Sequence, residues 1–343
     1  MPLHCQPTLQ RRALLASLTA TLAVPALLAR PAQAQTTPAP RRAKLVLAGP
    51  PAAVSWPLMR MVDAQALAAV AEQVELRTWK DPDQLRLLAL GGQADVLALP
   101  TNVAAMLHAR GVKLRLVNVS TWGVLWLVSR TPGPKTLADF RGAEIAMPFR
   151  GDMPDIVFRL LAARQRLDAL KDFRLRYVAS PLDAMQLLLM RQVEHALLSE
   201  PAVSLGLRKA AGLPLVGLTL HRAVDLQQEW GRVLGRAPRI PQAGIALMGA
   251  AADDAALTAT LQRAYAEALV GCEAAPDACA AAVAARQPML DAAAVADSIR
   301  ADNARFSTAH AARAELEFFF EQLHRLDPGL VGGRLPPADF YGG

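Results

Sequence analysis

Short apolar runs alternate with amphipathic runs along the chain, beginning at about residue 44. Runs rich in Val, Leu and Ile favour buried strands, whereas apolar residues spaced three and four apart favour helices. Such alternation is typical of a mostly parallel sheet with helices on both faces. The pattern predicts strands at residues 44–48, 74–79, 96–99, 114–119 and 125–129, and helices at residues 56–71, 82–90 and 102–109.

A second block with the same alternation follows the chain break at Thr131-Pro132-Gly133-Pro134. Residues 231–241, rich in Gly, Pro and Arg, indicate a crossing between the two blocks. A strand at residues 243–248 follows, and then only helical patterns from residue 253 to 326. The second block itself predicts strands at residues 144–147, 173–178, 195–198 and 215–220, and helices at residues 155–165, 182–191 and 202–211.

The two blocks share one local pattern. Residues 90–101 and 190–200 both run through a helix end, a turn, an acidic residue and a buried strand, with Asp95 matching Glu194. One interpretation is chance similarity between two βα units. The other is two similar lobes, each presenting the carboxyl end of a strand to a shared cleft, where open α/β sheets bind ligands.

The first 34 residues have the composition of an export signal. Arg11 and Arg12 precede a mostly apolar stretch at residues 13–29, and Ala32-Gln33-Ala34 has the small-x-small pattern of a signal-peptidase site. A membrane anchor is the alternative, but a proline and an arginine interrupt the apolar stretch. We therefore expect cleavage after Ala34 and a periplasmic protein.

The expected mature chain begins with a flexible leader at residues 35–43. The twin arginine fits export by a Tat-like or a Sec route. Because no cysteine directly follows the apolar stretch, we expect no lipid anchor.

Cys272 and Cys279 remain after cleavage, an even number of thiols in an oxidising compartment. On one unbroken helix they would be about 10.5 Å apart along the axis, too far for a disulfide. Pro276 predicts a break between a helix ending near Glu273 and another starting at Asp277, so that a disulfide can form at the corner. Two free, buried cysteines are the alternative.

Composition and charge exclude several classes of protein. With 53% hydrophobic residues among 343, the chain is not disordered. The net charge of +7 is spread out, with no basic run of five residues beyond residue 45, so no nucleic-acid partner is expected. The common motifs of serine hydrolases, phosphate-binding loops and zinc proteases are missing from the sequence. His195 is interpreted as a core histidine on a strand, and we expect no catalytic residue, metal site or cofactor.

Several further motifs occur in a characteristic order. They are a strand followed by glycine at residues 45–49, the Gly92-Gln93-Ala94-Asp95-Val96 turn, the run at residues 137–146, Glu200-Pro201 after a buried strand, and residues 335–341. Together they resemble the periplasmic substrate-binding proteins of ABC importers, in the nitrate, taurine and alkanesulfonate class.

That resemblance implies an α/β fold of the type 2 periplasmic-binding-protein kind, with two lobes of mixed sheet flanked by helices and a helical C-terminal region. Two crossings would join lobe 1 (residues 44–127 plus 244–343) to lobe 2 (residues 128–243). The implied protein is a monomer that closes on a small organic solute and delivers it to an ABC permease in the inner membrane. An enzyme on the same bilobed fold and a ligand-sensing periplasmic adaptor remain as alternatives.

Candidate ligand contacts lie in loops that follow strands. Trp56 can stack on a ligand or pack in the core, and hydroxyl and amide groups can cap helices or line a cleft. Trp122 and Gly123 lie before the first crossing, where members of the resembling family commonly touch their ligand. Members of the resembling family often carry Gly followed by Ser or Thr in the loop at residues 149–154, where this chain has Asp152. The alternative for Asp152 is that it caps the following helix and pairs with Arg150, and the alternative for Glu200 is a solvated acid at a helix start. Two acids and two tryptophans favour a solute with N–H donors or a flat ring over a bare anion. The full set of candidates is Ser55, Trp56, Thr101, Asn102, Trp122, Gly123, Arg150, Gly151, Asp152 and Glu200.

Overall fold

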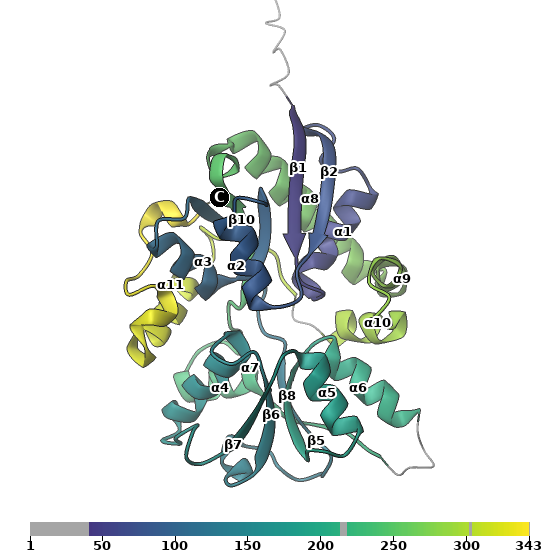
Figure 1. Cartoon of the computed structure of the whole chain (residues 1–343), viewed down its shortest axis with the longest axis vertical. Coiled ribbons are helices and arrows are strands. Elements are labelled where there is room, and N and C mark those ends of the chain that lie inside the picture. Colours follow the sequence, from purple (N-terminus) through teal and green to yellow (C-terminus); the bar gives the residue numbers. More distant parts are fainter. Residues whose placement is uncertain (1–40, 213–217, 302–303, 343) are drawn as a thin grey trace, which may run out of the picture. The chain divides into compact units, whose positions relative to one another are not determined.

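The computed structural model describes residues 41–212, 218–301 and 304–342. Within these residues the strands form two separate mixed sheets, each with its own helices (Figure 1). The six-stranded sheet has the order β11-β4-β10-β3-β1-β2, and the five-stranded sheet has the order β7-β6-β8-β5-β9.

The bounds of the strands follow the apolar runs closely. The six-stranded sheet contains β1 (Arg42–Gly49), β2 (Ala71–Thr78), β3 (Val96–Pro100), β4 (Leu114–Thr121), β10 (Ala243–Met248) and β11 (Ser307–Thr308). The five-stranded sheet contains β5 (Leu125–Ser129), β6 (Glu144–Pro148), β7 (Arg174–Val178), β8 (His195–Ser199) and β9 (His221–Asp225).

The helices alternate with the strands in the first two thirds of the chain and dominate the last third. They are α1 (Trp56–Asp63), α2 (Pro82–Leu90), α3 (Thr101–Ala109), α4 (Met153–Arg164), α5 (Pro181–Leu189), α6 (Ala202–Ala211), α7 (Leu226–Leu234), α8 (Ala255–Ala274), α9 (Pro276–Arg286), α10 (Ala292–Ala301) and α11 (Arg313–Leu326).

The two sheets repeat one arrangement. In the first, β1 pairs in parallel with β2 and β3, and β10 runs antiparallel to β3 and β4. In the second, β6 pairs in parallel with β7 and β8, and β5 runs antiparallel to β8 and β9. The shared pattern noted in the sequence therefore lies on equivalent strands, β3 and β8, which favours two similar lobes over chance.

The core of the six-stranded sheet follows from the alternation of side chains along a strand. On β3, Val96 and Ala98 face a cluster that includes Leu58 of α1 and Leu261 of α8. Leu97 and Leu99 of the same strand join the opposite cluster, which α3 and α11 cover. Burial on both faces requires the nearly continuous apolar run that the sequence shows here.

The chain passes from the first sheet to the second between Thr121 and Leu125 and returns between Leu234 and Ala243. The sequence placed the first change at residue 127, but all of β5 pairs within the five-stranded sheet. From here on, lobe 1 means the six-stranded sheet with its helices, and lobe 2 means residues 125–234. Helix α10, in the C-terminal region, packs against α6 of lobe 2.

Several expected elements differ in the structure. Helix α1 ends at Asp63 rather than residue 71, and turns lead into β2. Residues 218–220 are not a strand; β9 begins at His221, and residues 215–217 lie outside the described residues. Helix α7 occupies the start of the expected crossing at residues 231–241, and the two-residue strand β11 lies in the region expected to be helical.

The expected signal segment and its cleavage site lie outside the described residues, as does most of the leader. The leader is also shorter than expected, because Arg42 already pairs with Ala71 at the start of β1. In the described part of the chain no single helix is long and apolar enough to cross a membrane; α8 and α9 meet that test only as a pair bent by 113°.

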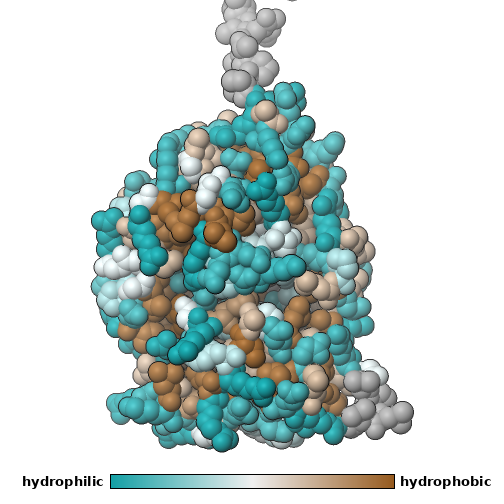
Figure 2. Space-filling model, in the orientation of Figure 1, coloured by the Kyte–Doolittle hydropathy of each residue, from teal (hydrophilic) through white to brown (hydrophobic). Residues whose placement is uncertain are grey.

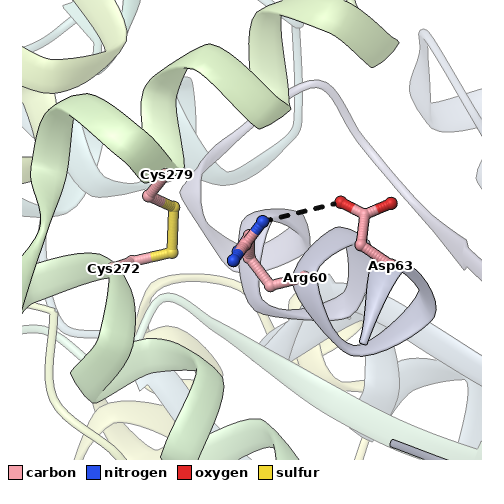
Figure 3. Close-up of a disulfide and its surroundings, with 4 residues drawn as sticks. All are labelled: Arg60, Asp63, Cys272 and Cys279. Atoms are coloured by element: carbon pink, nitrogen blue, oxygen red, sulfur yellow. Dashed lines mark ion pairs between the residues drawn. A yellow bond between two sulfur atoms is a disulfide. The ribbon is translucent and has the colours of Figure 1, made fainter. Parts of the chain in front are cut away.

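The predicted disulfide between Cys272 and Cys279 is confirmed. Helix α8 ends at Ala274 and α9 begins at Pro276, which brings the two Cα atoms to 5.1 Å. Figure 3 shows the bond at this corner, beside the Arg60–Asp63 ion pair of α1. Both cysteines are buried against Trp56.

Candidate functional site

A cavity of about 190 Å³ lies between the two sheets. From lobe 1 it is lined by the loops that follow β1, β2 and β3, and from lobe 2 by those that follow β6, β7 and β8. Residues of both crossings, among them Val124 and Gln242, complete the wall. The carboxyl ends of six parallel strands, three from each sheet, therefore converge on one space, the usual position of ligands in open α/β sheets.

Two of the predicted contact residues line the cavity, Asp152 and Glu200, and the remaining eight do not. Both carboxylates belong to lobe 2. Asp152 lies at the end of the loop between β6 and α4, and Glu200 directly follows β8. The structure engages both of them with arginines, so neither presents a free negative charge to a solute.

Asp152 precedes α4 but caps nothing with its side chain. Its carboxylate accepts a hydrogen bond from Arg86 of α2, at 3.0 Å, and this pair spans the two lobes. The expected partner Arg150 is exposed and lies over the ring of Tyr177 instead. Burial raises the pKa of Asp152, and the nearby Arg86 guanidinium opposes that rise.

Glu200 is 3% exposed, so the interpretation as a solvated acid at a helix start is wrong. One carboxylate oxygen accepts from Arg222 at 2.6 Å, and the other accepts from the backbone N–H of Ser204 at 3.1 Å. The guanidinium of Arg222 also lies over the ring of Trp126, 5.5 Å from its centroid. A buried carboxylate with these partners is a structural ion pair at the cavity wall.

Ser55 and Trp56 belong to the core of lobe 1. Ser55 is 1% exposed, and its hydroxyl lies so close to Gly49 that a Cβ there would meet it. Trp56 packs in the cluster around the disulfide, so core packing is the correct one of its two interpretations.

Thr101 and Asn102 start α3 and are also buried. The Thr101 hydroxyl donates to the carbonyl of Pro241 at 2.6 Å, which ties α3 to the return crossing. The Asn102 amide donates to the carbonyl of Leu330 at 3.4 Å. Both side chains hold backbone together rather than face the cavity.

Trp122 and Gly123 form the first crossing. The Trp122 indole donates to the carbonyl of Arg305 at 2.7 Å, beneath the guanidinium of Arg239. Gly123 has φ 135° and a Cβ there would collide with Gln227, so this position requires glycine. The crossing is thereby fixed to both the C-terminal region and α7.

Gly151 likewise occupies a turn, in the loop before α4. Its φ is 75°, and its N–H donates to the carboxylate of Asp155 at 2.9 Å. Asp155 also accepts from the hydroxyl of Tyr177 at 3.2 Å. The acid that stabilises this loop is therefore Asp155, not Asp152.

His195 is confirmed as a core histidine. Its Nδ1 lies 3.1 Å from the hydroxyl of Ser129, and its ring packs edge-on against Phe140. Burial lowers the pKa of His195, and the neighbouring Glu194 carboxylate opposes that shift.

Sequence reasoning missed Trp79 and Gln242. Trp79 follows β2 and lines the cavity, with its indole N–H donating to the carbonyl of Ala98 at 3.2 Å. Gln242 precedes β10, is 3% exposed, and accepts from the Val124 N–H at 2.9 Å. The strand-end argument applied to Asp152 would also have found Trp79, which had been assigned to the strand itself.

A proline stands at the start of every helix that faces the cavity. Pro82, Pro154 and Pro181 occupy the first turn of α2, α4 and α5. Pro100 and Pro201 directly precede α3 and α6. All five line the cavity, so rings without an N–H donor form much of its wall.

Comparison with known proteins gives matches among solved structures alone; no family model and no curated protein matches the chain. An ABC transporter protein from Parabacteroides distasonis is 21% identical, with a TM-score of 0.71 over 88% of this chain and 99% of that chain. The periplasmic aliphatic sulphonate binding protein of Escherichia coli is 18% identical, with a TM-score of 0.64 over 86% and 92%.

A third solved structure, the periplasmic nitrate-binding protein of Synechocystis, is 15% identical, with a TM-score of 0.65 over 84% of this chain and 82% of that chain. At these identities the likeness concerns the fold. The resemblance expected from the sequence is therefore found in three dimensions, and the chain has the two-lobed fold of periplasmic binding proteins.

Proposed function

We propose that this protein is the periplasmic solute-binding component of an ABC import system, which closes on a small organic solute between its lobes. The observation that carries the proposal is the cavity at the convergence of six strand ends, in a chain whose sheets are joined at two short crossings. A ligand held there contacts both lobes at once, so its binding favours the closed arrangement.

The contacts between the lobes suit a hinge that opens and closes. Arg86 pairs with Asp152 across the cavity mouth, and Arg208 of α6 pairs with Asp297 of α10 at 2.8 Å. Both partners of the Arg208–Asp297 pair are exposed, so this pair contributes only about 0.2–1 kcal/mol, whereas Asp152 is buried. Apolar packing also joins the lobes, because Ala294 of α10 is buried in a cluster of lobe 2. A solute that touches both walls adds its binding free energy to these contacts.

The solved structures with this fold support the role, since their names describe an ABC transporter protein, a sulphonate-binding protein and a nitrate-binding protein. We infer by the same route that the partner is an inner-membrane permease, that the protein acts as a monomer, and that it reaches the periplasm by its N-terminal signal.

The test begins with a thermal-shift screen of the purified protein against small organic solutes, because a ligand selective for the native state raises the melting temperature. Each solute that raises it is then recovered from the complex and analysed by mass spectrometry. Recovery of unchanged solute, together with loss of its uptake when the gene is deleted, is the expected result. Conversion of the solute would instead favour an enzyme, and normal uptake with lost signalling would favour a sensor.

A further inference from the structure

We propose that the solute is uncharged, about the size of a single ring, and carries an acceptor such as a carbonyl or amide oxygen. This inference rests on the proposed function and specifies the substrate class of the same cavity. Four independent features of the cavity wall support it: its size, its balanced charges, its proline-blocked helix starts and its neutral donors.

The size of the cavity limits the solute. Its volume is about 190 Å³, and an engineered apolar cavity of about 150 Å³ binds benzene. Trp79 and the proline rings provide flat, apolar walls. A single six-membered ring with one short substituent fits this volume.

The charges at the wall are already balanced. The guanidinium of Arg86 is engaged by Asp152, and that of Arg222 by Glu200. Lys80 lines the cavity without an ion-pair partner in the described residues, but it is exposed, so solvent screens its attraction for an anion. An anion taken into the cavity would therefore lose its hydration without gaining a buried cation in return.

Prolines and side chains take up part of the N–H donors at the helix starts around the cavity. An uncapped helix N-terminus is a ready anion site, but here prolines remove donors in the first turn of α2, α4 and α5. Side chains occupy others: Asp81 accepts from the N–H groups of Asp83 and Gln84, and Ser180 accepts from that of Asp183. At the starts of α2 and α5, a nitrate or sulfonate therefore finds few N–H groups to replace its shell of water.

Neutral donors are nevertheless present at the crossings. The Gln242 side chain is held through its oxygen by the Val124 N–H, whereas its Nε2 has no partner among the described residues. The hydroxyls of Thr121 and Ser199 also line the cavity, and neither has a hydrogen-bond partner in the described part of the chain. These amide and hydroxyl groups can donate hydrogen bonds to an uncharged acceptor on a solute that is otherwise surrounded by an apolar wall.

The experiment compares one ring with different charges. The quenching of tryptophan fluorescence, to which Trp79 contributes, is measured with benzamide, benzoate and benzenesulfonate, and with nitrate and taurine as ring-free solutes. We expect benzamide to bind at least about tenfold more tightly than benzenesulfonate, a difference of about 1.4 kcal/mol. Nitrate and taurine should produce no change at about 1 mM, where a weak ligand of about −4 kcal/mol half-saturates its site.

A positive charge placed in the cavity wall should reverse the preference for an uncharged solute over an anion. Leu182 lines the cavity from the start of α5. The Leu182→Lys substitution should weaken the binding of benzamide and strengthen the binding of benzenesulfonate, each about tenfold. Leu87→Lys is the control, because Leu87 is 69% exposed on α2 and does not line the cavity. Apolar patches are exposed on the face of the molecule that Figure 2 shows. If Leu182→Lys fails to fold, Ser199→Lys, at the end of β8 in the same lobe, makes the same test.

Each outcome bears on a different claim. Tighter binding of benzenesulfonate, nitrate or taurine by the unaltered protein overturns the uncharged-solute inference while leaving solute binding intact. Binding of none of the five solutes also overturns the inference, and the broader screen then decides the proposed function by itself.

Discussion

At the scale of single residues, the cavity shows how an acid can lie in a binding wall without acting as a charge. Glu200 is buried, but Arg222 and the Ser204 N–H take up both of its oxygens. Asp152 is similarly engaged by an arginine that lies 66 positions away in the chain. Such partners are invisible in the sequence, because nothing local links residue 86 to 152 or residue 222 to 200. The sequence identifies the two acids as lining residues, but it cannot show that they are neutralised.

Removing the guanidinium of Arg222 should therefore destabilise the fold. Arg222→Met leaves the carboxylate of Glu200 buried without its ion-pair partner, and we expect a loss of about 3 kcal/mol in the free energy of unfolding. The control is Arg130→Met, whose partner Glu194 is half exposed, and it should cost under about 1 kcal/mol. Urea unfolding of both variants measures the difference; equal losses would show that Glu200 is not held by this pair.

At the scale of elements, the apolar pattern predicted most strands and helices but not where the chain turns. Helix α1 stops at Asp63 because the chain turns through Gln65, at φ 51°, although Ala-rich residues continue to favour a helix. Strand β9 carries charged and half-buried residues at the edge of its sheet, so it lacks the apolar run that marks a buried strand. The local apolar pattern therefore does not predict where a helix ends when tertiary contacts decide it, and it does not predict a strand at the edge of a sheet.

The corner between α8 and α9 is an element whose geometry the sequence did predict. Replacing both cysteines, as in Cys272→Ala with Cys279→Ala, should lower the free energy of unfolding by about 2–3 kcal/mol, since the loop the disulfide closes is short. Guanidinium unfolding of this variant is compared with that of the parent protein with and without reductant. Two free thiols on titration of the non-reduced parent would contradict the disulfide.

The pairing of β1 with β2 has a predicted acid dependence. Hydrogen bonds from Arg77 and Lys44 lower the pKa of Glu75 from 4.5 to about 2. A lowered pKa in the folded state means that the stabilisation is present above pH 4.5 and is lost as the pH falls from 4.5 toward 2. The stability of Glu75→Gln should consequently fall less steeply than that of the parent across this range. Urea unfolding at several pH values measures the free energy of unfolding of both proteins. Parallel curves of this free energy against pH would refute the prediction.

At the scale of the whole chain, the order of motifs predicted two lobes, and the structure has two sheets of equivalent arrangement. The sequence could do this because each βα unit is recognisable locally and because the breaks between blocks are rich in Pro and Gly. It could not reveal that both crossings and the helix starts form one cavity, since that depends on packing between residues over 100 positions apart, such as Thr101 and Pro241.

Processing of the N-terminus is a separate prediction at this scale. The Ala32-Gln33-Ala34 sequence predicts that the periplasmic form begins at Gln35. Intact-mass measurement of protein released from the periplasm should give the mass of residues 35–343. A periplasmic form that retains Met1 would exclude this cleavage.

The most direct test of the central claim, that a solute held between the lobes closes them, is a distance measured across the cavity mouth. Nitroxide labels are placed by Leu87→Cys on α2 and Arg150→Cys in the loop before α4, both exposed, with Cys5→Ser to leave no other free thiol. Arg86→Ala, which removes the pair with Asp152, should lengthen the distance measured by pulsed electron paramagnetic resonance, and saturating benzamide should shorten it again. If the distance distribution is the same with and without bound solute, both in the labelled protein and in its Arg86→Ala variant, the account is contradicted.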